Sequence, residues 1–347
     1  MIDFTFTEEQ EMFRKAAREF AETQVAPHVA DMEKTGEVSQ AVVKALAEAD
    51  MMGLTVPEEY GGLGLGYMAR LIALEEISRI SVATAMMLQV FALGIDPINR
   101  FGTEEQKKKY LPGLAKGERL ATVGVTEPTG GSDPTGGRTT YRKDGDDYII
   151  NGRKCFITNS HIADTITVLA KSEDDPKSFC AFVIEMGTEG FKATHVEHKV
   201  GFRGCNTGEL SLEDCRVPKS QLLGEEGKGL KVSMTAIGDV GRGGMVGCAL
   251  GLQAACLEAS IKFANERILY GKPISTVPAI QNKIAEMKVD LEAGRLLGYR
   301  AAAMHDAGGR SSNEFAVAKY YTTEAAQKAA KIAVDIHGGY GCMEEYA

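Results

Sequence analysis

The spacing of apolar residues changes twice along this chain of 347 residues, and these changes limit the folds it can adopt. Up to about residue 118, apolar residues recur every three or four positions, as in amphipathic helices. Between residues 119 and 228, short runs of alternating polarity are separated by turn residues, as in a small barrel or sandwich. Helical spacing returns from residue 229. The order predicts an α+β protein with domains at residues 1–118, 119–228 and 229–347.

Local signals within this layout predict where single elements lie. Thr7 and Gln10 have the spacing of a capping box, which predicts that a helix begins just after Thr7. The glycine-rich run GGLGLG at residues 61–66 follows no predicted strand, so we interpret it as a tight loop between helices and not as a dinucleotide site. Further helices are expected at residues 40–51, 68–91, 234–267, 277–307 and 312–336.

Residues 123–160 combine two glycine-flanked polar motifs with strand-like runs. The first motif is VTEPTGGSD and the second is YIINGRKCFITN. The Asn151-Gly152 pair is typical of a type I′ turn, so it predicts a hairpin between two short strands. Side chains alternate along a strand, which puts Phe156 and Thr158 on one face of the second strand. Backbone donors beside a flat aromatic ring predict a site for a planar, electron-rich ligand.

Charge and cysteine content argue against several classes of function. The formal net charge of −9 disfavours a nucleic-acid partner. The 7 cysteines include no CxxC pair, which argues against a metal site or a disulfide framework and favours a reducing, cytoplasmic location. No apolar run approaches the roughly twenty residues that span a bilayer, so membrane insertion is not expected. Because helical spacing starts at once, we expect no signal peptide.

Motifs along the whole chain resemble those of the acyl-CoA dehydrogenase family. In order, they are VTEPTGGSD, YIINGRKCFITN, GFRGCNTGELSLEDCRVP, GEEGKG, ERILYGKPI and IHGGYG. The resemblance implies an N-terminal helical domain, a middle β-barrel, a C-terminal four-helix bundle, FAD as cofactor and a homotetramer. It also implies an acyl-CoA substrate that loses an α-proton to a carboxylate and a β-hydride to flavin N5. The expected electron acceptor is an electron-transferring flavoprotein.

The resemblance also implies roles for single residues. Phe156 stands where the family usually has tryptophan, and an aromatic ring is retained. From the residues alone, the hydroxyls of Thr126 and Thr158 could instead cap their own strand ends. Asp239 and Arg242 could likewise form a surface ion pair. The implied FAD contacts are Val123, Val125, Thr126, Ser132, Phe156, Ile157, Thr158, Arg267 and Gly339, and the implied contacts of the acyl-CoA substrate are Ser132, Asp239 and Arg242. The resemblance implies that Arg267 reaches the FAD pyrophosphate of a neighbouring subunit and that Asp239 and Arg242 meet the CoA arm.

Two positions depart from the family pattern at the expected FAD site. Pro278 and Asp335 align with glutamines that contact FAD in the family. A proline side chain has no hydrogen-bond donor, and a carboxylate repels a pyrophosphate. The adenine end of the cofactor is therefore expected to be bound differently or more weakly.

This sequence has no carboxylate at either of the positions that carry the catalytic base in the family. The chain reaches Ala347 before the Tyr-Glu-Gly-Thr segment in which most members carry the glutamate, so the C-terminal region is expected to be incomplete. The position used by a minority of members is Gly241. Asp96 is the tentative base, and it would suit a cyclic or already unsaturated acyl group. Alternatively, Asp96 caps a helix that begins at Pro97, or the protein binds acyl-CoA or flavin without catalysis.

Overall fold

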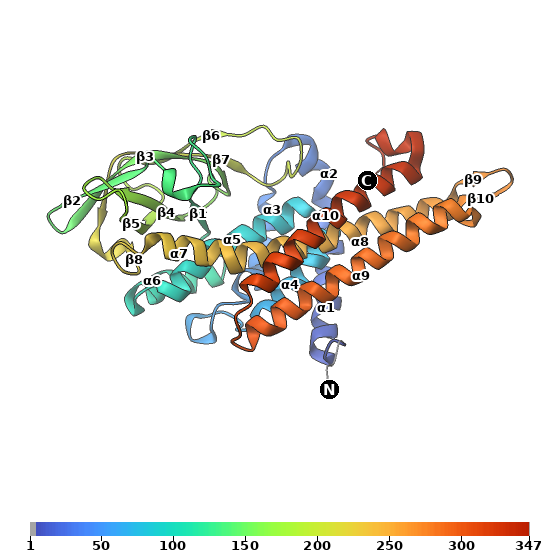
Figure 1. The fold of residues 1–347 in the computed structure, drawn as a ribbon, viewed down its shortest axis with the longest axis horizontal. Coiled ribbons are helices and arrows are strands. Elements are labelled where there is room, and N and C mark those ends of the chain that lie inside the picture. Colours follow the sequence, from blue (N-terminus) through green and yellow to red (C-terminus); the bar gives the residue numbers. More distant parts are fainter. Residues whose placement is uncertain (1–4, 347) are drawn as a thin grey trace. The chain divides into compact units, whose positions relative to one another are not determined.

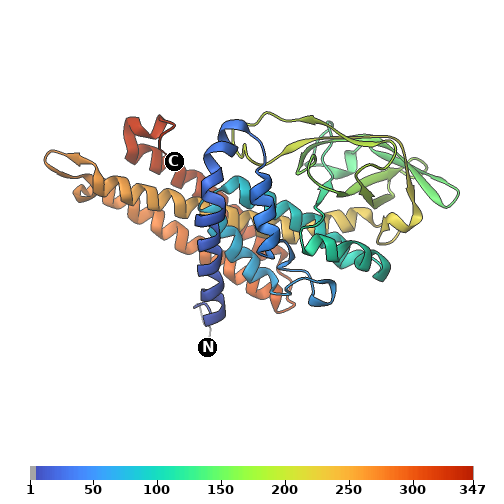
Figure 2. The same cartoon turned by 180° about the vertical axis from the view of Figure 1, so that it is seen from behind.

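The structure is a computed structural model that describes residues 5–346, and contacts between residues divide it into two units. Figures 1 and 2 show its elements from opposite sides. Helices precede and follow a run of strands along the chain, so the predicted α+β class is confirmed. The first unit comprises the described parts of Met1–Ala26, Tyr67–Ala85 and Arg242–Ala347, and the second comprises Pro27–Gly66 and Met86–Gly241.

Helices make up most of the first unit. In both views α10 lies beside α8 and α9, and the contacts between these elements agree (Figures 1 and 2). Arg295 on α9 pairs with the buried Glu75 on α4 at 2.6 Å, so a charged contact joins two helices distant in sequence. The helices are α1 (Glu8–Phe20), α4 (Gly66–Ser78), the start of α5 (Val82–Phe101), α8 (Arg242–Glu266), α9 (Pro278–Asp306) and α10 (Ser312–His337), and the short strands β9 (Ile268–Leu269) and β10 (Lys272–Pro273) follow α8.

The second unit contains the β domain and the helices that contact it. Its helices are α2 (Ala26–Thr35), α3 (Gln40–Glu48), the rest of α5, α6 (Glu104–Ala115) and α7 (Gly229–Ala236), followed by a π-helical turn at Ile237–Gly241. Its strands are β1 (Ala121–Gly124), β2 (Thr140–Asp144), β3 (Asp147–Thr158), β4 (Thr165–Ser172), β5 (Phe179–Glu185), β6 (Phe191–Val196), β7 (Thr207–Pro218) and β8 (Leu222–Leu223).

The sheet of the second unit follows the order β6-β7-β3-β2-β4-β5-β8, and β1 pairs in parallel with β4. Inward side chains from distant positions along this order share one core, as in a barrel. Leu212 of β7 and Phe182 of β5 both belong to it, and Tyr141 and Tyr148 pack their rings against each other there. The middle β domain is therefore confirmed, and β1 ends at its rim with the VTEPTGGSD motif.

The predicted helix start after Thr7 is confirmed. The hydroxyl of Thr7 accepts a hydrogen bond from the Gln10 N–H, and the Gln10 side chain accepts one from the Thr7 N–H. The single helix expected at residues 68–91 is instead two helices, α4 and α5, which a short break at residues 79–81 separates.

The hairpin predicted at Asn151-Gly152 is wrong. Strand β3 runs straight through both residues, and the turn lies earlier, at Gly145-Asp146, where β2 and β3 meet. Gly145 has φ = 64°, which suits glycine in such a turn. Asn151-Gly152 instead marks a register shift against β7, and Asn151 accepts a hydrogen bond from the Asp214 N–H at 2.7 Å. An Asn-Gly pair therefore serves a β-bulge here.

Two helical segments, Val82–Phe101 and Gly229–Glu266, are long and apolar enough to cross a membrane by length and composition. Most of each segment is buried within the protein. Burial of an apolar helix inside a core accounts for this composition, so the two segments are weak support for a membrane protein.

Replacing Gly152 with alanine is expected to destabilise the β domain. An added Cβ would lie 2.4 Å from Oγ1 and 2.6 Å from Cα of Thr139, so β3 and the chain at Thr139 would have to separate. We expect Gly152→Ala to lower the free energy of unfolding in urea by about 1–3 kcal/mol. Gly201→Ala is the control, because nothing lies within 4 Å of its added Cβ. Equal stability of the two variants would contradict this account.

Candidate active site

A buried ion pair fixes the loop that follows β1. Nζ of Lys154, on β3, lies 2.7 Å from Oε1 of Glu127, in the VTEPTGGSD motif, and neither side chain is more than 4% exposed. The Glu127 carboxylate also accepts hydrogen bonds from the backbone N–H groups of Arg138 and Thr139. The Cys155 N–H donates to the Thr126 carbonyl at 3.0 Å. Residues 126–139 are thus held against β3 at both ends of the loop.

The surroundings of this ion pair shift the pKa of both of its residues. Burial acts to raise the pKa of Glu127, but Lys154 and the backbone donors outweigh it, so the pKa of Glu127 is lowered. Burial lowers the pKa of Lys154, and the charge of Glu127 opposes that shift. The hydrogen-bonded geometry supports the ionised form of both groups.

Strand β3 exposes one aromatic ring beside this loop. Phe156 is 64% exposed, although its neighbours Cys155 and Ile157 are each 3% exposed. Phe156 has φ = 56° and lies where the register between β3 and β7 shifts. A phenylalanine in this backbone region is uncommon and costs free energy, which points to a function for the exposed ring.

The other predicted flavin-contacting residues of the β domain differ in their exposure. Val123, Val125, Thr126 and Thr158 are partly exposed, and Ser132 is exposed on the loop. The Ile157 side chain belongs to the core of the β domain, so only its main chain can meet a ligand. These seven predicted residues, Val123, Val125, Thr126, Ser132, Phe156, Ile157 and Thr158, all lie on β1, its loop or β3.

The alternative role for the two threonines finds no support. In the part of the chain that the structure describes, neither the Thr126 nor the Thr158 hydroxyl forms a hydrogen bond to its own strand end. The Thr158 carbonyl, in contrast, accepts a hydrogen bond from the Thr122 hydroxyl at 2.8 Å. The end of β3 is thus tied to β1 while the Thr158 hydroxyl stays available.

Asp96 does not cap a helix, so that alternative is wrong. It lies within α5, which continues through Pro97 to Phe101. Pro97 lacks only one backbone donor, and the buried apolar residues of α5 keep the helix intact across it. Asp96 is 9% exposed, and its Oδ1 lies 2.9 Å from Nε of Arg100, one turn further along α5.

Arg100 connects the tentative base to a residue expected to contact CoA. Its Nη1 lies 3.1 Å from Oδ2 of Asp239, in the π-helical turn Ile237–Gly241. One guanidinium therefore lies between two carboxylates. The sequence analysis missed Arg100, although its spacing of four residues from Asp96 on a helix is a signal for an ion pair. Asp239 thus has a partner other than the predicted Arg242.

Arg242 is the first residue of α8, in the first unit. Its Nη1 lies 3.5 Å from the hydroxyl of Ser312, at the beginning of α10. Arg242 is exposed, so its guanidinium is accessible to an anionic group.

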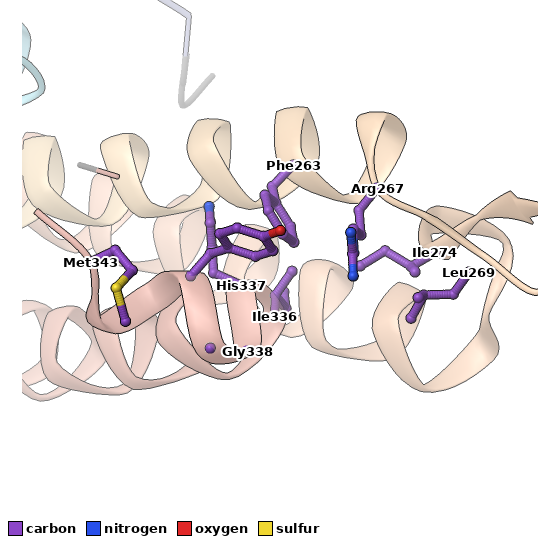
Figure 3. A pocket seen from close by; sticks show the side chains of 10 residues that line it. Phe263, Arg267, Leu269, Ile274, Ile336, His337, Gly338 and Met343 are labelled. Carbon is purple, nitrogen blue, oxygen red and sulfur yellow. The ribbon is translucent and has the colours of Figure 1, made fainter. Parts of the chain in front are cut away.

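Arg267 and Gly339 line one cavity of about 410 Å³ in the first unit. Figure 3 shows the labelled side chains of Phe263 and Arg267 near the end of α8 and that of His337 on the neighbouring α10. The Phe263 and His337 rings stack at 4.3 Å, and the Arg267 guanidinium lies 5.4 Å from the ring centroid of Tyr340. A cation above an aromatic wall can receive a phosphate or the edge of a planar ring.

The two departures from the family pattern have structural roles. Pro278 is the first residue of α9, where a missing backbone N–H costs no helical hydrogen bond. Asp335, on α10, forms an ion pair with Lys283 at 3.1 Å. The repulsion that we expected from its charge is thus partly offset by a cation on α9.

Three family models match consecutive parts of the chain, and they describe the N-terminal, middle and C-terminal domains of acyl-CoA dehydrogenases. They match residues 7–118, 122–215 and 227–347. The chain belongs to the acyl-CoA dehydrogenase family. The C-terminal match extends to residue 347, which does not confirm the expectation of a missing C-terminal segment.

Relatives and solved structures agree with this family over nearly the whole chain. An acyl-CoA dehydrogenase of Bacillus subtilis is 41% identical over 98% of this chain and 90% of its own length. The caffeyl-CoA reductase-Etf complex subunit CarC of Acetobacterium woodii is 37% identical, over 98% of this chain and 91% of its own. The structure of butyryl-CoA dehydrogenase from Megasphaera elsdenii matches with a TM-score of 0.97 and 35% identity, covering 100% and 92% of the two chains.

The family is FAD-dependent, and the residues of the β domain fit such a cofactor. A flavin is a flat aromatic system with hydrogen-bonding edges. The exposed Phe156 ring offers a flat face, the Thr158 hydroxyl is available, and the loop residues at Gly130–Ser132 lie exposed at the rim. In the first unit, the Arg267 guanidinium has a charge and shape that suit a pyrophosphate, and its role toward FAD stays a prediction.

Removing Lys154 is expected to unfold this face of the β domain. Lys154→Met leaves the Glu127 carboxylate buried without its cation, and we expect a loss of about 3–5 kcal/mol in the free energy of unfolding. Bound FAD, measured by its visible absorbance after desalting, should fall with it.

The double variant Glu127→Gln/Lys154→Met is the control for this prediction. It removes both charges but keeps an amide oxygen for the N–H groups of Arg138 and Thr139. It should recover most of the lost stability. If Lys154→Met unfolds in urea like the unchanged protein, the ion pair does not hold the loop.

Proposed function

We propose that this protein dehydrogenates an acyl-CoA thioester to the enoyl-CoA by loss of an α-proton and a β-hydride. The observation that carries the proposal is the exposed Phe156 ring on a strained backbone, beside a loop that Glu127 and Lys154 hold in place. When bound there, FAD supplies the acceptor for the hydride. The family shows dehydrogenation of acyl-CoA in general.

In this proposal, different side chains bind the substrate, exclude water and remove the proton. Asp239 and Arg242 hold the CoA arm, and Phe156 with Val123 exclude water from the flavin face. The Asp96 carboxylate removes the proton from the substrate carbon, and the electron pair of that C–H bond forms the new C=C bond. A buried carboxylate can serve as such a base, and the burial of Asp96 supports this role.

The electron partner of this protein is proposed to be an electron-transferring flavoprotein. The Acetobacterium woodii relative is named as a subunit of a caffeyl-CoA reductase-Etf complex, which supports such a partner. The same name describes a reductase, and the proposed chemistry runs in either direction between acyl and enoyl thioester. The potential of the electron partner would then set the direction.

Asp96→Asn tests the proposed base. The amide cannot take a proton, so we expect substrate-driven bleaching of the flavin absorbance under anaerobic conditions to slow by about 10²-fold or more. FAD content and acyl-CoA binding should persist. A panel of straight-chain, alicyclic and unsaturated acyl-CoA thioesters identifies the substrate, and a preference for a cyclic or already unsaturated acyl group would support the substrate class expected with Asp96 as base.

Gly241→Glu in the Asp96→Asn background tests the same role from a second position. The nearest atoms to an added Cβ at Gly241 are 3.8 Å away, which is ordinary van der Waals contact, so the backbone there accepts a Cβ without a clash. We expect partial recovery of bleaching from this new carboxylate. Near-normal turnover of Asp96→Asn alone would show that Asp96 is not the base. A yellow unchanged protein that stays oxidised with every thioester would support a protein that binds without catalysis.

We also propose a homotetramer. Ile268, Leu269 and Tyr270, next to the Arg267 cavity, are 53%, 45% and 100% exposed, and such apolar clusters often mark interfaces. Light scattering should give four times the chain mass of 37.3 kDa. Leu269→Glu should reduce both assembly and FAD content, whereas Val200→Glu, at another exposed apolar residue, should not. A monomer that retains FAD would contradict the proposal.

A further inference from the structure

Three polar residues lie on one face of the apolar helix α5. Gln89, Asp96 and Arg100 are separated by seven and four residues, which places them along one side of a helix. Gln89 is 2% exposed and Asp96 is 9% exposed. Buried polar groups cost free energy unless they have hydrogen-bond partners, so this face must have matching groups opposite it.

The matching groups belong to the π-helical turn Ile237–Gly241. Nε2 of Gln89 donates to the Val240 carbonyl at 3.0 Å and to the Gly241 carbonyl at 3.3 Å. Arg100 reaches Asp239 in the same turn. A π-helical turn departs from the regular helical hydrogen-bond pattern, and such turns occur frequently at functional sites. Helix α5 therefore holds the turn through both backbone carbonyls and a side chain.

The guanidinium of Arg100 pairs with two carboxylates, one on α5 and one on the π-helical turn. The side chains of Asp96, Arg100 and Asp239 are 10%, 27% and 18% exposed, so solvent screens their interactions only in part. Arg100 also lines a cavity of about 450 Å³, together with Lys228, Lys231 and Glu225. Because the two carboxylates share the Arg100 guanidinium, a change at one alters how strongly Arg100 stabilises the charge of the other.

We propose that Arg100 is a positioning residue that couples Asp239, the expected contact of the CoA arm, to Asp96. It holds the π-helical turn at the distance from α5 that substrate binding requires, and it keeps the Asp96 carboxylate charged and oriented. The second part rests on the proposed function, in which Asp96 is the base. The first part concerns CoA binding and is independent of it.

Arg100→Met keeps the length of the side chain and removes its charge. We expect the Kd for acyl-CoA, measured by calorimetry with the thioester that bleaches the flavin best, to rise about tenfold. If no thioester bleaches the flavin, butyryl-CoA is the probe. The acidic limb of the kcat/KM profile should move to higher pH by roughly one unit or more, because a carboxylate without its guanidinium keeps its proton to higher pH.

Arg216→Met is the matched control. Arg216 also bridges two carboxylates, Asp144 and Asp147, but it lies on β7 away from the face of α5 described above. This variant should leave Kd and the pH profile unchanged. Arg100→Lys keeps the positive charge but has a single donor group in place of the guanidinium fork. Its pH profile should therefore lie closer to that of the unchanged protein than its Kd does.

A double-mutant cycle of Arg100→Met and Asp239→Asn distinguishes coupling between Arg100 and Asp239 from a general disturbance of the structure. We expect the effect of Arg100→Met on Kd to shrink at least threefold once Asp239 is neutral, since the partner it positions is gone. If the two effects on Kd simply multiply, or if Arg100→Met behaves like Arg216→Met, the proposal is overturned. If Arg100→Met does not fold, the cycle is run with Arg100→Lys.

Failure of the proposed function gives a different result. An unchanged protein that binds acyl-CoA without bleaching its flavin would refute the dehydrogenase proposal, and the cycle on Kd would still decide the role of Arg100. A shift of Kd without any shift of the pH profile would overturn the coupling to Asp96.

Discussion

The ion pair between Glu127 and Lys154 is the contact on which the position of the loop after β1 depends. It lies at the point where β1 ends and the polar loop begins, and both charges are nearly excluded from solvent. A lone charge in that position would be costly, so the two residues are stable there only together. The pair also takes up the backbone donors of Arg138 and Thr139, which brings the far end of the loop back to β3. The exposed residues between these anchors gain a fixed position without a core of their own.

A similar arrangement occurs on α5, but there the polar groups face a helix turn and not a loop. Gln89 satisfies two carbonyls of the π-helical turn, and Arg100 bridges Asp96 and Asp239. In both places a few buried polar contacts orient exposed or reactive groups, while apolar packing supplies most of the stability. Regular strands and helices carry the anchors, and irregular backbone carries the groups that we propose to contact ligands.

Much of the fold could be predicted from periodicity and capping. The change of spacing located the β domain, and the Thr7 capping box located the first helix, because both signals are local. The errors came from local signals with two physical meanings. Asn151-Gly152 suits a turn and also a bulge, and only the pairing of β3 with β7 decides between them. Asp96-Pro97 suits a helix start, but the apolar packing of α5 tolerates a proline inside the helix.

For a similar reason, the sequence pointed to some residues of the candidate site and missed others. Residues on β1 and β3 lie in one contiguous motif, so family resemblance could point to all of them together, and their roles toward FAD stay predictions. Arg100 is 139 residues from Asp239 in sequence, and its contact with Asp239 depends on tertiary structure. In the sequence, Gln89 is only a polar residue within an apolar helix. Its role becomes evident from the Val240 and Gly241 carbonyls that lie opposite it in the structure. Contacts of this kind cannot be read from spacing along a single element.

The π-helical turn at Ile237–Gly241 also has a consequence for how such a protein can diversify. A π turn holds one residue more than an α turn, and removing that residue would leave regular helix on both sides. Each residue of an α-helix turns the chain by about 100°, so the loss would carry Asp239 away from Arg100 and present a different side chain to α5. A single deletion or insertion at this turn could therefore exchange the group that faces Arg100 in one step, and leave the hydrophobic core on either side with its sequence unchanged.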